Sequence, residues 1–72
     1  MSKILNWFQD EYEKIQGSSM PQEDKDLQYA GLMSEMEQEF QIPSLRNPEW
    51  EQENRAIITL YKKISMSRKL GG

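Results

Sequence analysis

Apolar residues recur at steps of three and four positions in three separate segments of this chain. Steps of this size place side chains on one side of a helix, whereas a half-buried strand needs alternation at every second position. The pattern therefore predicts three amphipathic helices, near residues 2–16, 21–41 and 48–68. Their predicted core faces are Leu5, Phe8, Tyr12 and Ile15 in the first helix, Tyr29, Leu32, Met33, Met36 and Phe40 in the second, and Ile57, Leu60, Tyr61 and Ile64 in the third.

Capping and turn residues separate the three segments. Asn47 can accept a hydrogen bond from a free backbone N–H at the start of the third helix, and Pro48 suits the first helical position. Gly17 predicts a left-handed end to the first helix, while Pro43 favours an end near Gln41 for the second. The apolar residues of the second connection are expected to fold back over the end of the bundle; they are Ile42 and Leu45.

Three helices with short connections predict an all-α fold. We expect residues 1–70 to form one helical domain, a small antiparallel three-helix bundle, with residues 71–72 as a flexible tail. The alternative is a helical hairpin that dimerises into a larger bundle, because a chain of 72 residues has a small core. Gly31 costs about 1 kcal/mol relative to alanine inside a helix. A close helix crossing is the favoured reason for this glycine, and a kink is the alternative.

Composition excludes several kinds of chemistry. The chain has no cysteine and no histidine, so it lacks thiolate and imidazole metal ligands and the side chains of Ser–His or Cys–His catalysis. Alternating glutamates at residues 35, 37 and 39 are more typical of a solvated helix face than of a paired-carboxylate site. We therefore expect no enzyme activity, no cofactor and no metal. No apolar run is long enough to span a membrane. The acidic residues near the N-terminus are unlike a signal peptide, which favours a cytoplasmic location.

The formal net charge of −3 conceals an uneven distribution. Residues 10–53 contain all 12 acidic side chains, whereas residues 54–72 contain five basic side chains and no acidic one. One interpretation is internal, in which oppositely charged helices attract each other and complement the helix dipoles. The other is functional, in which a basic end of the molecule meets an acidic partner.

The hypothesis that remains is binding to another protein of unknown identity, as an inhibitor, adaptor or modulator of a bacterial or phage process. Size and helical pattern are similar to small bacterial and phage regulators and to helical immunity proteins, a likeness at the level of the fold. The alternatives are a nucleic-acid-binding regulator that uses the basic third helix, which is disfavoured, and an immunity-type or self-assembling protein such as a homodimer. Tryptophan and basic side chains are the candidate binding residues, since Trp and Arg dominate protein interfaces. They are Trp7, Arg46, Trp50, Arg55, Lys62, Lys63, Arg68 and Lys69.

Overall fold

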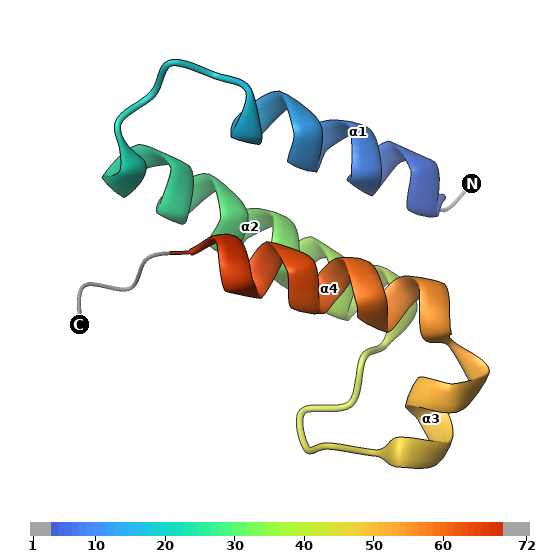
Figure 1. Ribbon diagram of the computed structural model, residues 1–72. Helices are drawn as coiled ribbons and strands as arrows, with labels where there is room; N and C mark the ends of the chain where they lie inside the picture. The colour runs from blue at the N-terminus through green and yellow to red at the C-terminus, as the bar shows by residue number, and fades with distance from the viewer. Residues whose placement is uncertain (1–3, 69–72) are drawn as a thin grey trace.

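The computed structural model describes residues 4–68, which form four helices and no strand. The helices are α1 (Leu5–Gln16), α2 (Gln22–Phe40), α3 (Pro48–Glu53) and α4 (Arg55–Ser67). The chain reverses direction between α1 and α2 and again between α2 and α4, so the three long helices lie antiparallel (Figure 1). The predicted all-α bundle is therefore confirmed. Lys69 and the tail predicted at residues 71–72 lie outside the described residues.

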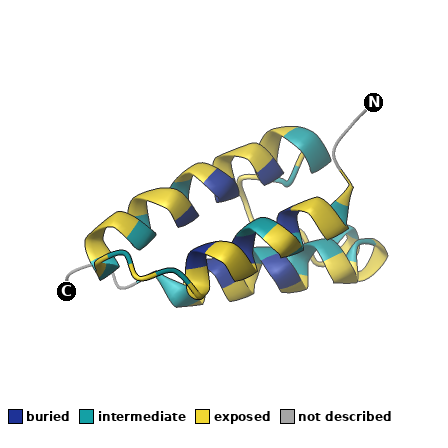
Figure 2. Ribbon diagram, turned by 90° about the horizontal axis from the view of Figure 1, so that it is seen from above, coloured by how far each residue is buried: buried dark blue, intermediate teal, exposed yellow. Residues whose placement is uncertain are grey.

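The central helix is α2, because α1 and α4 both pack extensively against it and touch each other much less. Buried positions lie on the sides of the helices that face one another (Figure 2). Phe8, Met36 and Ile64 are completely buried, one from each long helix. Each of the predicted stripes therefore supplies the core, whose nine buried residues are Phe8, Tyr12, Ile15, Tyr29, Leu32, Met33, Met36, Leu60 and Ile64.

Aromatic rings join α1 to α2. The ring of Phe8 lies 5.3 Å from that of Phe40, and the ring of Tyr12 lies 5.7 Å from that of Tyr29. Both pairs fall in the range in which tilted aromatic rings add to the energy of simple burial. The Tyr12 hydroxyl also lies 2.8 Å from the Ser67 hydroxyl, which ties α1 to the end of α4.

The single helix predicted over residues 48–68 is wrong, because Asn54 interrupts it. Its backbone is non-helical, with φ −129° and ψ 46°, and its side-chain amide donates to the Trp50 carbonyl at 2.9 Å. Asparagine competes for backbone partners in this way, and such a bond closes α3. The Asn54 carbonyl then accepts from the Ile58 amide at 3.0 Å and begins α4. At the other end of α3, the predicted cap is confirmed, since the Asn47 side chain accepts from the Trp50 amide.

The helix ends differ from prediction in two places. Gly17 has a φ of −86°, so the predicted left-handed end of α1 is wrong; the Ser18 hydroxyl instead donates to the Ile15 carbonyl at 2.8 Å. The left-handed residue is Gln41, with φ 53°, and α2 ends there as Pro43 predicted. In the connection that follows, Ile42 packs against the core as expected, but the expectation for Leu45 is wrong, since it is 82% exposed.

Alanine substitutions should destabilise the protein more at the centre of the core than at its edge. Leu32→Ala removes a side chain that is 6% exposed and should lower the free energy of unfolding by about 2–4 kcal/mol. The sequence also predicts Ile57 as a core residue, but its side chain is half-buried and packs at the edge of the core. Ile57→Ala should therefore lower the free energy of unfolding by less than about 2 kcal/mol. Urea denaturation of both variants measures the difference. Equal losses would contradict the assignment of Leu32 to the centre and Ile57 to the edge.

Ionisation of Tyr61 should make the free energy of unfolding depend on pH in the alkaline range. Its hydroxyl donates to the Glu37 carboxylate and joins α4 to α2; burial first, and then this hydrogen bond, raise the pKa of Tyr61 from 10.0 to about 12. The folded state therefore holds this proton more tightly than the unfolded chain does. Its contribution to stability is complete below about pH 10 and is lost as the pH rises through about 12.

Urea denaturation between about pH 9 and pH 12 checks this expectation. The free energy of unfolding of the wild type should fall more steeply across that range than that of Tyr61→Phe, which has no proton to lose at this position. Burial also raises the pKa of Tyr29, but that residue is present in both proteins and affects both alike. Parallel curves for the two proteins would show that Tyr61 does not couple ionisation to folding.

Candidate functional site

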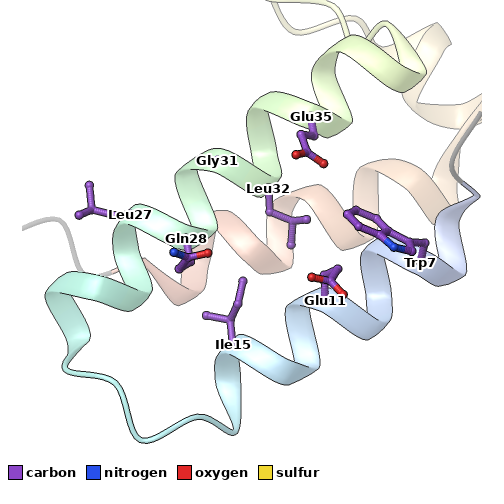
Figure 3. A pocket seen from close by; sticks show the side chains of 8 residues that line it. All are labelled: Trp7, Glu11, Ile15, Leu27, Gln28, Gly31, Leu32 and Glu35. Carbon is purple, nitrogen blue, oxygen red and sulfur yellow. The ribbon is translucent and has the colours of Figure 1, made fainter.

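A groove of about 280 Å³ lies between α1 and α2. No residue of α4 lines it, and Figure 3 shows the lining side chains in front of the α1–α2 pair with α4 behind. The two helices thus use one side to hold α4 and leave the groove on the other. Its lining consists of Trp7, Glu11 and Ile15 from α1, and Leu27, Gln28, Gly31, Leu32 and Glu35 from α2.

Two core residues form the floor of the groove, although most of the surface exposed in its lining is polar. Ile15 and Leu32 belong to the core and expose only 9% and 6% of their surface. Trp7 is 36% exposed, and its ring meets that of Phe8 edge-on at 5.0 Å, so a core residue holds it in place. Leu27, on the α2 side, is 72% exposed. Both Trp7 and Leu27 therefore offer apolar surface beside a floor that cannot move without disturbing the core.

Gly31 helps to keep the groove open. A Cβ atom at this position would meet nothing within 4 Å, so the close helix crossing predicted from the sequence is wrong. The backbone does not require glycine either, since no glycine among residues 4–68 has a positive φ. A larger side chain would fit at this position without a clash and would stand in the groove. What the glycine provides is therefore open space beside the α2 backbone.

The surroundings of Trp7 are acidic. A second hollow on α1 adjoins the groove at Trp7. It is lined by Trp7, Asp10, Glu11, Glu13 and Lys14. The Lys14 ammonium already binds the Glu11 carboxylate at 3.2 Å, an exposed pair of the kind that contributes little to stability. From the α2 side Glu35 adds a further carboxylate to the lining of the groove. The rim thus carries more negative than positive charge around an apolar floor.

Four of the predicted basic residues lie together on another face of the molecule. Arg46 and Arg55 line a cleft of about 400 Å³ that also involves α3 and α4. Lys62 and Lys63 follow along α4, beside Met66, which is 83% exposed. The Lys62 ammonium binds the Glu51 carboxylate at 3.3 Å, so part of this positive charge is compensated.

Two other predicted site residues belong to the fold. Trp50 is half-buried in α3 and lines neither the groove nor the cleft. Arg68 is half-buried, and its Nη1 donates to the Met33 sulfur at 3.6 Å. The Arg68 Nε is buried without a hydrogen-bond partner. Their positions make both side chains poorer candidates for contact with a partner than Trp7, Arg46, Arg55, Lys62 and Lys63.

Sequence reasoning missed the α2 side of the groove. Leu27 was not among the predicted binding residues, and Gly31 was expected to lie against another helix. The sequence did contain a signal, since a glycine in mid-helix and a leucine off the main stripe lie four positions apart on one helical face. Only the placement of α1 beside α2 shows that this face and Trp7 line the same groove.

No family model, curated protein or solved structure matches this chain. Among residues 4–68, none of the helices combines the length and the hydropathy needed to cross a lipid bilayer. The same stretch of chain has no group of three or more acidic side chains arranged to hold a metal ion.

Proposed function

We propose that this protein acts by binding a helical segment of another protein in the groove between α1 and α2. The observation that carries the proposal is a groove of mixed polar and apolar lining, which presents the exposed Trp7 and Leu27 on the side of the helix pair that α4 leaves uncovered. Helices dock readily into grooves of this kind with their apolar face inward. Tryptophan beside such a groove is the residue type that contributes most often to interface energy.

The same proposal covers the role of the protein in the cell. A chain that binds one segment of a partner acts as an inhibitor, adaptor or modulator and needs no catalytic group of its own. We place it in the cytoplasm, since it has no cysteine and needs no oxidising compartment for its fold. A bacterial or phage process is the proposed setting, on the strength of size and helical character alone.

Site-specific photocrosslinking in the source cell tests the proposal. A photoreactive residue at Gln28, which lines the groove, should form a covalent adduct with another protein. The same residue at Gln38, which is exposed on α2 but outside the groove, should not. Gly31→Lys should abolish the Gln28 adduct by filling the groove, and Ser34→Lys should leave it intact, since Ser34 lies outside the lining. No adduct from Gln28, or equal adducts from Gln28 and Gln38, would contradict the proposal.

Nucleic-acid binding is a second candidate function, favoured by one observation. Arg46, Arg55, Lys62 and Lys63 gather on one face, and phosphate groups are bound by such clusters. Against it, Lys62 is engaged by Glu51, which also lines the cleft, and the acidic side chains of the chain lie within a domain only a few Debye lengths across. Protein binding is therefore the function we prefer.

Duplex DNA binding at physiological salt separates the two functions. We expect the wild type to bind random duplex DNA more weakly than about micromolar at roughly 150 mM salt, because a few partly compensated cations release few counterions. Fluorescence anisotropy measures this directly. Micromolar binding that is lost in the Lys62→Glu, Lys63→Glu double variant would establish the nucleic-acid function instead.

A further inference from the structure

We propose that the segment held in the groove is a basic amphipathic helix, with apolar side chains at positions i, i+4 and i+7 and lysine or arginine on both flanks. This inference rests on the proposed function and adds the chemistry of the partner. Three features of the molecule lead to it: the length of the groove, the charge of its rim, and the character of the helix that already packs on the other side of α1 and α2.

The length of the groove fits two turns of a helix from a partner protein. Its lining runs from Trp7 to Ile15 on α1 and from Leu27 to Glu35 on α2, nine residues on each, or about 12 Å along the helix axis. Side chains at i, i+4 and i+7 of a helix span about 10.5 Å, so three of them fit within the length of the lining, where Trp7 and Leu27 offer apolar contact. A longer apolar stripe would extend beyond the lining into water.

The charge of the rim selects a basic partner. Carboxylates of Asp10, Glu11 and Glu13 border Trp7 on α1, and Glu35 lies on the α2 side. The one cation of these linings, Lys14, is already bound by Glu11. Positive side chains flanking the partner's apolar stripe would meet this field on both rims. An acidic or neutral helix would bury the same apolar area without that attraction, so charge would set the specificity.

The protein itself contains an example of such a helix. On the opposite side of the α1–α2 pair, α4 packs its apolar stripe, including Leu60 and Ile64, against the core. It has no acidic residue and carries Arg55, Lys62 and Lys63 outside that stripe. The α1–α2 pair thus already holds one basic amphipathic helix. A second on the open side would complete a four-helix arrangement around the same pair.

Fluorescence titration with synthetic peptides tests the inference. The probe is a helical peptide of leucine at i, i+4 and i+7 with lysine at the flanking positions, and its control carries glutamate for each lysine. In a Trp50→Phe background, Trp7 is the reporter, and calorimetry with the wild type repeats the titration without any change to the chain. We expect the lysine peptide to shift the Trp7 emission saturably and to bind at least about tenfold more tightly than the glutamate peptide.

Two lysine substitutions on α2, which change the net charge by the same amount, show whether the peptide binds in the groove. Gly31→Lys places a long side chain in the groove and should weaken binding of the lysine peptide by about tenfold or more. Ser34→Lys adds the same charge to the same helix outside the lining and should change binding less than about twofold. Neither substitution disturbs a buried contact, and circular dichroism checks the fold of each. If Gly31→Lys fails to fold, Leu27→Lys serves in its place, since Leu27 is exposed and lines the groove.

Several outcomes would overturn the inference. Equal binding of the lysine and glutamate peptides would remove the charge selection, and equal losses in the two lysine variants would show a general effect of net charge. Sedimentation of the peptide-free protein as a dimer that Gly31→Lys dissociates would show that a second copy occupies the groove. A Gln28 crosslink to a partner segment that is not a basic amphipathic helix would overturn this inference and leave the proposed function standing. Loss of that crosslink altogether would instead remove the proposed function.

Discussion

The packing of two short helices against α2 is the interaction on which this structure depends. The helices α1 and α4 have 12 and 13 residues, lengths at which an isolated helix is marginal in water. Both are stabilised by burying an apolar stripe on α2, which contributes Tyr29, Leu32, Met33 and Met36 to the core. Because α1 and α4 touch each other little, α2 is the element that makes their packing cooperative. Any change that displaces Met36 therefore affects both neighbours at once.

This arrangement also explains why a groove exists. Two helices packed side by side have two sides on which a third helix can lie, and one further long helix covers only one of them. The remaining side must end in solvent, and the sequence gives it an unusual composition. Trp7 and Leu27 are exposed there, whereas Ile15 and Leu32 remain in the core below. The groove is thus a direct consequence of a bundle with three long helices, and the two exposed apolar side chains are the feature that an ordinary solvated face lacks.

The periodicity of apolar residues predicted the three long helices and most of the core, because each stripe is a local property of the chain. Events that depend on a balance of local hydrogen bonds were harder to predict. Asn54 stops one helix and starts another within a segment whose apolar period continues without a break. Gly17 is the residue expected at a left-handed helix end, yet Gln41 adopts that conformation. Such ends are decided by small energies to which tertiary packing also contributes.

The candidate site was less predictable than the fold. Exposure of Trp7 and the grouping of Arg46 with Arg55 follow from how helices are placed, which no periodicity specifies. The charge asymmetry was visible in the sequence, and the structure divides it between two surfaces. Carboxylates border the groove, while cations gather on the side formed by α3 and α4. Some charges act within the molecule, as in the Lys62–Glu51 pair that joins α4 to α3. The Lys62–Glu51 pair thus agrees with the internal interpretation of the asymmetry, while the functional interpretation stays a prediction.

Gly31 connects the stability of the chain with its proposed function. Glycine in a helix costs about 1 kcal/mol relative to alanine, and a small domain has little stability to spare. Neither a positive φ nor a close packing partner requires it in the free protein. The helix that we propose for the groove would supply the missing reason, because the absence of a side chain would let a partner approach the α2 backbone closely between Leu27 and Glu35. The cost in the free protein would then be offset by contacts that form only in the proposed complex.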